Sequence, residues 1–226
     1  GCGSRVKSAV IPKQFIEIGG VPVIVRTVRA FLAVEEIDMA YVGIKPDWHE
    51  YTDELFERFG IDKERIRVID GGADRNGTVM NIAEAIVAEH GENEGDIILT
   101  HDAVRPFVTE KIIKYNIEAM REHSACGTYM PAVDTIIRSD GEKVKETLNR
   151  SELYQAQTPQ TFRLGDLRRN YYSLSEEQNK KLTDTCSVFT ACNEDIYLVI
   201  GDALNFKITT DSDLRMANAL AELSEK

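Results

Sequence analysis

A glycine-rich opening followed by two cationic residues is the first feature that could do chemistry. The chain begins Gly1-Cys2-Gly3-Ser4-Arg5, and glycines let backbone N–H groups approach a phosphate closely. Arg5 could add charge-assisted hydrogen bonds, and Lys13 could reach a triphosphate lying over such a loop. A dinucleotide fingerprint needs a third glycine where Val6 stands, so a nicotinamide site fits poorly. The combination indicates a triphosphate site; the alternative is a chain end beside an ordinary surface lysine.

A second group of reactive side chains follows the strongly apolar segment 96–100. Ligands of open α/β sheets bind at the carboxyl ends of such strands. Asp102 is a suitable ligand for Mg²⁺, which takes one or two carboxylates together with phosphate oxygens. Arg105 could meet a phosphate through two parallel N–H bonds. The alternative is an Asp–Arg pair that organises the loop, and His101, without a second ligand at metal spacing, is expected to be structural.

A third cation, Lys207, follows the apolar segment 196–200. It could bring a point charge to a transferring phosphoryl group, or it could be an ordinary lysine at a strand edge. Two further polar segments, 158–160 and 182–184, are typical of turns.

The elements that must position these residues alternate along the chain. Short β-prone segments predict strands at 39–44, 66–70, 96–100, 125–130 and 196–200. Segments with helical spacing predict helices at 21–34, 47–59, 79–87, 109–122, 163–180 and 211–224. This alternation predicts a Rossmann-like α/β fold, an open, mainly parallel sheet with helices on both faces. The regularity breaks at 131–160.

The irregular part contains a predicted β-hairpin, residues 135–147, around an Asp140-Gly141 turn. It has few apolar residues to dock on the sheet, and a two-stranded ribbon is marginal alone. We therefore expect residues 131–155 to form a projecting arm that builds a two-fold homodimer. The alternative is a solvated excursion of the chain.

Length and composition bound the possibilities. The 226 residues are expected to form one domain, 1–226. With 38 acidic and 27 basic residues the net charge is −11, which argues against nucleic-acid or membrane partners. No apolar run reaches the roughly 18–20 residues of a membrane span. The scattered cysteines predict reduced thiols in a cytoplasmic protein.

Taken together, these segments resemble those of a known family, the CTP-dependent polyol-phosphate cytidylyltransferases. The family acts on 2-C-methyl-D-erythritol 4-phosphate or on ribitol 5-phosphate. The segments in family order are Gly1-x-Gly3-x-Arg5, Pro12-Lys13-Gln14-Phe15, Asp102-Ala103-Val104-Arg105-Pro106, Thr158-Pro159-Gln160-x-Phe162, Thr183-Asp184 and Asn205-x-Lys207-Ile208-Thr209. Each is weak alone, but six in order over nearly the whole chain are specific. The family usually has a strand before its glycine loop, so that strand is expected before residue 1.

The resemblance implies transfer of CMP from CTP to a polyol phosphate, with release of pyrophosphate. It assigns catalysis to Arg5, Lys13 and Lys207. It assigns nucleotide binding to Gly1, Gly3, Gly71, Gly72, Arg75 and Thr78. It assigns the polyol phosphate to Arg105, Thr135, Arg150, Thr158 and Thr183. Mg²⁺ would bind Asp102, and in the family the arm crosses a homodimer, so Thr135 and Arg150 could serve the neighbouring subunit.

The choice of polyol rests on finer resemblance. Methylerythritol enzymes usually read Asp-Ala-Ala-Arg-Pro and ribitol enzymes Asp-Ser-Val-Arg-Pro, and residues 102–106 lie between the two. Segments 73–76, 153–158 and 182–186 look more like the ribitol group. D-ribitol 5-phosphate is therefore the favoured substrate, with 2-C-methyl-D-erythritol 4-phosphate, of isoprenoid synthesis, as the alternative.

Two functions of other classes remain open from the residues. A nicotinamide oxidoreductase would need the missing third glycine and an acidic ribose contact about 20 residues further on. Glu17 comes too early, and Glu35 follows a predicted helix rather than a strand. A non-catalytic interaction module would use the hairpin and leave the basic residues scattered.

Overall fold

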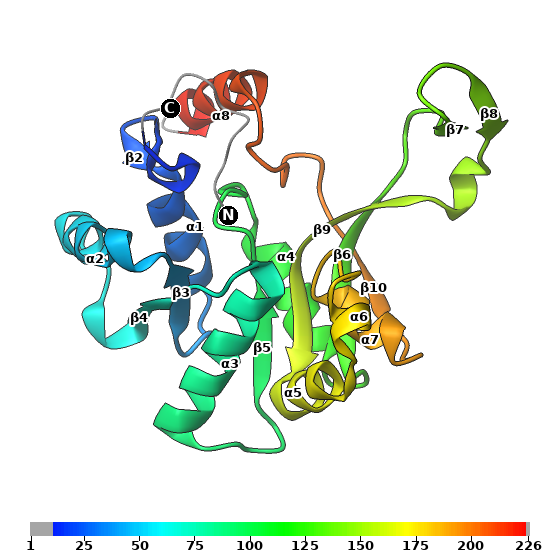
Figure 1. Ribbon diagram of the computed structural model, residues 1–226. Helices are drawn as coiled ribbons and strands as arrows, with labels where there is room; N and C mark the ends of the chain where they lie inside the picture. The colour runs from blue at the N-terminus through cyan, green and yellow to red at the C-terminus, as the bar shows by residue number, and fades with distance from the viewer. Residues whose placement is uncertain (1–10, 225–226) are drawn as a thin grey trace.

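The structure is a computed structural model, and it describes residues 11–224 of the chain. Its largest sheet has the strand order β10-β6-β9-β5, formed by Tyr197–Ile200, Ala125–Pro131, Tyr154–Arg163 and Ile97–Thr100 (Figure 1). Strand β10 runs parallel to β6, whereas β9 runs antiparallel to both of its neighbours. A separate parallel pair joins β3 (Ala40–Ile44) to β4 (Ile66–Asp70). The predicted α/β class is confirmed.

The direction of β9 corrects the expectation of a mainly parallel sheet, because it makes the largest sheet mixed. The chain leaves this sheet through β6, passes through the hairpin and returns through β9. The chain turns back through the hairpin without crossing the sheet, and neighbouring strands joined in this way are antiparallel. Sequence reasoning left residues 154–160 within an irregular stretch, because the buried part of β9 carries Gln157, Thr158 and Gln160 instead of apolar residues.

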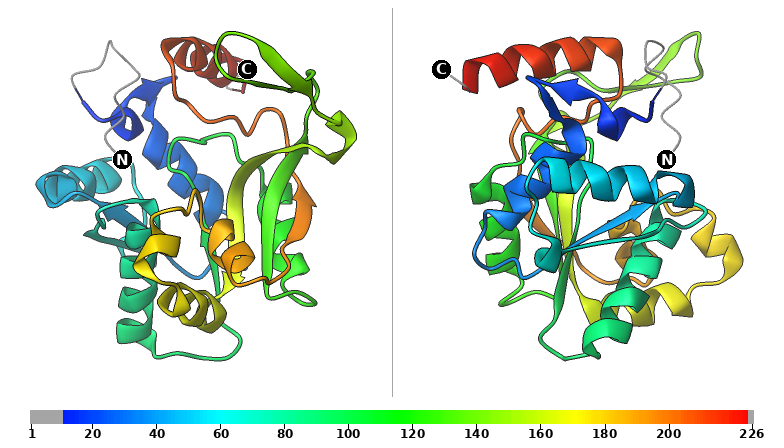
Figure 2. Two further views of the ribbon diagram at one scale, coloured as in Figure 1. Left: turned by 45° about the vertical axis from the view of Figure 1, so that its right-hand side comes forward. Right: turned by 90° about the vertical axis from the view of Figure 1, so that its left-hand side faces the viewer.

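Helices cover both faces of this sheet, as predicted (Figure 2). On one face lie α3 (Arg75–His90), α5 (Leu164–Ser173) and α7 (Cys186–Ala191), and on the other lie α1 (Val23–Leu32) and α4 (Glu110–Ala119). Ile98 of β5 packs with the first group and its neighbour Leu99 with the second. Successive strand residues point to opposite faces, which explains why this segment is apolar throughout.

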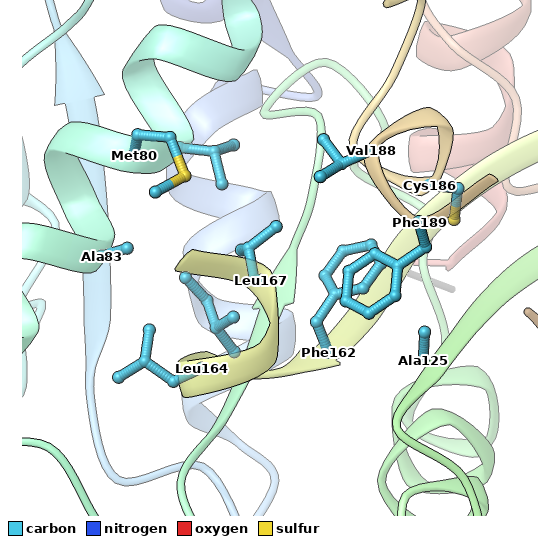
Figure 3. Packing of buried hydrophobic residues seen from close by; sticks show 11 residues of the cluster. Met80, Ala83, Ala125, Phe162, Leu164, Leu167, Cys186, Val188 and Phe189 are labelled. Atoms are coloured by element: carbon cyan, nitrogen blue, oxygen red, sulfur yellow. The ribbon is translucent and has the colours of Figure 1, made fainter. Parts of the chain in front are cut away.

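The core on the first face fixes α7 against the sheet (Figure 3). The rings of Phe162 on β9 and Phe189 on α7 stack with their centroids 4.9 Å apart. Leu164 and Leu167 of α5 and Met80 of α3 are buried in the same cluster. Burial of a large apolar side chain stabilises the fold by about 1.5–3 kcal/mol. This packing therefore gives the N-terminal end of α7 a well-defined place relative to α3 and β9.

A smaller cluster joins the beginning of the described chain to its end. The short ribbon of β1 (Glu17–Ile18) and β2 (Val21–Pro22) packs on α8 (Asp211–Ser224). Ile18, Val23, Ile208 and Ala217 are buried together between these elements. This contact brings the segments around Lys13 and Lys207 to the same side of the molecule. The remaining helices are α2 (His49–Arg58), beside β3 and β4, and the short α6 (Glu176–Asn179). In residues 11–224 no helix combines the length and the apolar character that a membrane crossing needs.

The predicted hairpin is present and extends away from the sheet (Figure 1). Its strands are β7 (Ile137–Ser139) and β8 (Val144–Thr147), and every residue of both is exposed. The turn passes through Gly141 with φ of +103°, a backbone conformation that favours glycine. Val133, at the base, is 75% exposed, and Val144 is 64% exposed. The arm therefore presents apolar side chains without a core of its own.

Candidate active site

Three cationic side chains from separate segments meet at the carboxylate of Asp102, in the loop after β5. Lys207 Nζ lies 3.0 Å from Oδ2, Arg75 Nε lies 3.1 Å from Oδ1, and Arg105 Nε lies 3.5 Å from Oδ2. Burial alone would raise the pKa of Asp102, but the positive charges of Arg75 and Lys207 outweigh it and hold that pKa well below its usual range. One carboxylate thus faces three cations, and the excess positive charge suits a phosphate-rich ligand.

Arg105 links three segments of the site. Its Nη1 donates to the backbone carbonyl of Asn205 at 2.7 Å and its Nη2 to that of Ala156 at 3.4 Å. The residue is only 9% exposed, and its buried Nε makes no hydrogen bond although Asp102 lies beside it. Arg105 therefore organises the loop, the return strand β9 and the segment before Lys207 at the same time.

His101 and Thr158 hold the same loop through hydrogen bonds. His101 Nε2 lies 3.1 Å from the carbonyl of Arg105, and its Nδ1 lies 2.9 Å from Thr158 Oγ1. Burial lowers the pKa of His101 to about 4, so the ring is neutral at pH 7. In the tautomer that satisfies every contact, Nε2–H donates to Arg105 and the Thr158 hydroxyl donates to Nδ1. The hydroxyl also accepts from the backbone N–H of Asp102 at 3.1 Å.

Lys13 approaches this cluster from the opposite end of the sequence. It begins a short 3₁₀ turn, Lys13–Phe15, and its Nζ donates to the carbonyl of Thr209 at 2.9 Å. Thr209 stands two residues after Lys207 and is held by Asp213 of α8, whose Oδ2 accepts from its N–H and its hydroxyl, both at 2.8 Å. The structure therefore brings Lys13 near Lys207. Three predicted residues, Gly1, Gly3 and Arg5, lie outside the described residues.

The glycine turn before α3 has a steric explanation. A Cβ on Gly72 would lie 2.4 Å from the backbone carbon of Gly77, so the strand end and the helix can approach this closely only with glycine. The N–H of Gly72 donates to Thr78 Oγ1 at 2.9 Å, and that hydroxyl donates to the carbonyl of Asp74. Gly72 and Thr78 thus shape the turn from which Arg75 reaches Asp102, and Gly71 precedes it with its N–H bonded to the carbonyl of Ile44.

The remaining predicted residues lie apart from the Asp102 cluster. Thr183 is exposed, and its N–H donates to Ser187 Oγ at 3.1 Å. Thr135 and Arg150 are exposed on the arm, where Arg150 Nη1 donates to the carbonyl of Val133 at 2.7 Å. Within residues 11–224, none of these three contacts Asp102 or its cations.

Sequence reasoning assigned no role to several buried polar residues that surround the cluster, namely Asn76, Gln160, Thr185 and Asn205, although Gln160 and Asn205 stand in quoted motifs. Thr185 Oγ1 accepts from Arg75 Nη1 at 2.6 Å, and Asn205 Nδ2 donates to the carbonyl of Thr158 at 2.8 Å. Each stands within two positions of a residue that the sequence predicts for the site. This nearness is the signal that could have found them. No residue type distinguished them from neighbouring turn residues.

A cavity of about 340 Å³ opens beside the cluster. Arg105 and Lys207 line it together with Met130, Val133, Ala156 and Phe206. A lining that combines two cations with apolar side chains suits a small phosphorylated carbon chain. In the part of the chain that the structure describes, no group of three His, Cys, Asp or Glu residues could hold a metal ion. A divalent cation would therefore need phosphate oxygens in addition to Asp102, which is how Mg²⁺ is commonly bound.

Comparison with known proteins identifies the family. Residues 1–222 match the family model of IspD, 2-C-methyl-D-erythritol 4-phosphate cytidylyltransferase. The 4-diphosphocytidyl-2C-methyl-D-erythritol synthase of Anaerococcus prevotii is 31% identical, with a TM-score of 0.80 over 92% of this chain and 88% of that one. The 2-C-methyl-D-erythritol 4-phosphate cytidylyltransferase of Francisella tularensis is 28% identical, with a TM-score of 0.80 over 92% and 93%.

A third structure agrees with these two. The enzyme of the same name from Thermus thermophilus is 27% identical, with a TM-score of 0.75 over 93% of this chain and 94% of that one. All of these descriptions name methylerythritol or its phosphate, so they support that substrate better than the ribitol 5-phosphate that the sequence favoured. The oxidoreductase and the non-catalytic module are set aside, because the chain belongs to the IspD family and is a CTP-dependent cytidylyltransferase.

Proposed function

We propose that this cytidylyltransferase moves CMP from CTP onto 2-C-methyl-D-erythritol 4-phosphate. The observation that carries this proposal is the group of three cations around Asp102, placed beside a cavity of about 340 Å³ with apolar walls. The family match supplies the nucleotide and the class of acceptor. The apolar part of the cavity, including Val133 and Phe206, would accept the branched carbon chain, and the cations would face the phosphates.

The reaction needs charge stabilisation more than covalent chemistry. A phosphate oxygen of the polyol phosphate attacks the α-phosphorus of CTP in line, the bond to the β-phosphate oxygen breaks, and pyrophosphate leaves. Lys207 would neutralise the α-phosphate. Its side chain is 43% exposed, so its ammonium group can move from Asp102 to a bound phosphate. Lys13, tied beside it through Thr209, would stabilise the pyrophosphate as its charge grows.

The other assignments extend this site outward. Gly71 and Gly72, just before α3, would lie along the cytosine and ribose. Arg75, held against Asp102, would face the phosphates of the nucleotide, and Arg105 would approach the polyol phosphate. Asp102 fits a divalent cation, Mg²⁺ in the simplest case, shared with phosphate oxygens. When bound, the cation would neutralise part of the triphosphate charge. The glycine loop with Arg5 would cradle the triphosphate.

The arm would complete the site of a second copy of the chain. Thr135 and Arg150 do not contact the Asp102 cluster of their own chain, and Ile137 and Val144 of the hairpin strands expose apolar surface. A closed two-fold dimer lets both arms do the same work and covers that surface. Cys126, Cys186 and Cys192 are unpaired, which supports a reducing location, and we place the enzyme in the cytoplasm.

Pyrophosphate release with CTP and each polyol phosphate tests the proposal. With methylerythritol phosphate, kcat/KM is expected to exceed that with D-ribitol 5-phosphate by about 100-fold or more, since several contacts of roughly 1 kcal/mol distinguish the chains. The same ratio in favour of ribitol phosphate would overturn the assignment. Val133→Asp, which puts a charge on the apolar wall, should raise KM for the polyol phosphate and leave KM for CTP unchanged.

A further inference from the structure

A buried hydroxyl stands behind the cationic cluster. Thr185, immediately before α7, is 1% exposed. Its Oγ1 lies 2.6 Å from Arg75 Nη1 and 3.3 Å from Asn76 Oδ1. A guanidinium can only donate and an amide oxygen can only accept, so the hydroxyl accepts from Arg75 and donates to Asn76. Both of its roles are filled by the first two residues of α3.

The sheet holds Thr185 in place through Gln160 of β9, a residue that is 1% exposed. Gln160 Oε1 accepts from the backbone N–H of Thr185 at 3.2 Å and from that of Cys186 at 3.3 Å. Its Nε2 donates to Asp184 Oδ2 at 2.6 Å. The place of the Thr185 hydroxyl is therefore set by a hydrogen-bonded amide on a central strand, and satisfied buried networks of this kind are rigid.

Arg75 is attached at two points as a result. Its Nε donates to Asp102 Oδ1 at 3.1 Å, and its Nη1 donates to Thr185. A guanidinium is planar, so two attachments define both its position and its plane. Its side chain is 32% exposed, and among residues 11–224 Asp102 is the other side chain that holds it against rotation toward solvent.

We propose that Thr185 is a positioning residue for nucleotidyl transfer: its hydroxyl holds Arg75 against Asp102, so that the guanidinium is already in place when the triphosphate arrives. The proposal rests on the proposed site around Asp102. Charges fixed in advance act more on the transition state than on ground-state binding. Loss of the hydroxyl should therefore lower kcat, whereas KM for CTP should change little.

The test compares two variants of the same residue. Thr185→Val keeps the shape and removes the hydroxyl, and it should lower kcat about tenfold or more, as misplaced catalytic groups do. Thr185→Ser keeps the hydroxyl and should stay within about threefold of the parent, under roughly 1 kcal/mol. The matched control is Thr52→Val in α2, which removes a buried hydroxyl that donates to the carbonyl of Trp48 at 2.6 Å and has no hydrogen bond to Arg75 or Asp102. It should lower the melting temperature without lowering kcat.

A double-mutant cycle shows whether Thr185 acts through Arg75. Arg75→Lys keeps the charge but cannot hold both attachments, so adding Thr185→Val to it should lower kcat no further. If the two losses multiply in full, or if Thr185→Val loses stability but keeps the parent's kcat, the proposal is wrong. If Thr185→Val does not fold, Arg75→Lys alone decides, and kcat at the parent's level would overturn the proposal.

Asp102→Asn separates this inference from the site on which it rests. A large fall in kcat with Asp102→Asn and none with Thr185→Val would overturn only the positioning role. No effect of Asp102→Asn would overturn the proposed site itself.

Discussion

The Asp102 cluster and the projecting arm contain similar residues, but these are more buried in the cluster than on the arm. Both are rich in charged and polar side chains. Around Asp102 these side chains are tied to backbone groups of distant segments, as Arg105 is to Asn205 and Ala156. On the arm they pair across the hairpin, Arg138 with Glu146 and Lys145 with Asp140, at 2.7 and 2.6 Å.

The difference lies in what surrounds each charge. The side chain of Asp102 is 13% exposed, whereas Glu146 is 51% exposed and Arg138 is 68% exposed. Burial makes each contact stronger and each loss more costly, while exposed pairs are screened by water and salt. The cluster is therefore organised by its own chain, whereas the described residues give the arm no such buried environment.

The largest expected effect comes from removing one cation of the cluster. Lys207→Met should lower kcat about 10²–10³-fold, because a charge fixed near the reacting phosphate is lost. The melting temperature should change by less than about 2 °C, since the lysine is 43% exposed. Lys180→Met, on a lysine that is 79% exposed, is the control and should leave both quantities unchanged. A Lys207→Met enzyme with the parent's kcat would remove Lys207 from the mechanism.

The second prediction tests whether the arm serves another subunit. Arg150→Ala and Lys13→Ala chains should each be nearly inactive alone. Refolded together in equal amounts, they should recover about one quarter of the parent's pyrophosphate release, because half of the two-fold dimers would carry one intact site. No recovery in verified heterodimers would mean that Arg150 does not act on the partner's site. The control is Arg138→Ala, also on the arm, which should keep the parent's pyrophosphate release without a second chain.

The third prediction concerns pH and the neutral ring of His101. Its pKa is lowered by burial to about 4, while an unfolded histidine has a pKa near 6.5. The unfolded chain therefore binds the proton first, and the free energy of unfolding falls as the pH drops from about 6.5 toward 4, by at most about 3 kcal/mol. Asp102 contributes in the same direction but at lower pH, because its pKa is lowered too: its contribution is present above the unfolded pKa near 3.9 and is lost as the pH falls below it.

Urea unfolding at pH 7.0, 5.5 and 4.5 measures this dependence. His101→Gln, which can still donate to the carbonyl of Arg105, should be less stable at pH 7 and should lose less stability between pH 6.5 and 4.5. If the free energy of unfolding fell equally with pH in parent and variant, His101 would not be the source of the pH dependence. The arm should not contribute, because Lys145 and the backbone N–H of Lys143 lower the pKa of Asp140 to about 2.

The two regions also differ in how far the sequence predicts them. The hairpin follows from local chemistry, since Asp140-Gly141 specifies a turn, and Gly141 indeed has a positive φ. Asp102 and Lys207 were identified as candidates because each follows an apolar strand, and the fold brings them within 3.0 Å. In both cases the signal lies within a few residues of the feature.

Properties that depend on contacts between distant segments cannot be predicted from the sequence pattern alone. Thr158 stands in a recognisable motif, yet its hydroxyl contacts His101 and the N–H of Asp102 beneath the loop. Strand β9 was missed because Gln157 and Gln160 are buried by partners, Asp202 and Asp184, that only the fold supplies. A buried amide looks polar in the sequence and behaves as core in the structure, because it is hydrogen-bonded there.

The smallest expected effect is on the arm's own ion pair and sharpens the contrast with the cluster. Arg138 and Glu146 approach to 2.7 Å, closer than the 3.0 Å between Lys207 and Asp102. Distance alone would make the arm's pair the stronger one. Exposure reverses that order, because two charges about 4 Å apart in water interact by only about 1 kcal/mol, and fixing both side chains costs entropy. Arg138→Ala should therefore lower the free energy of unfolding by less than about 0.5 kcal/mol and leave kcat unchanged. Raising the salt concentration should abolish even this difference. A loss above about 2 kcal/mol would show that a partner buries the pair in the assembled protein, because only a desolvated pair is that costly to break.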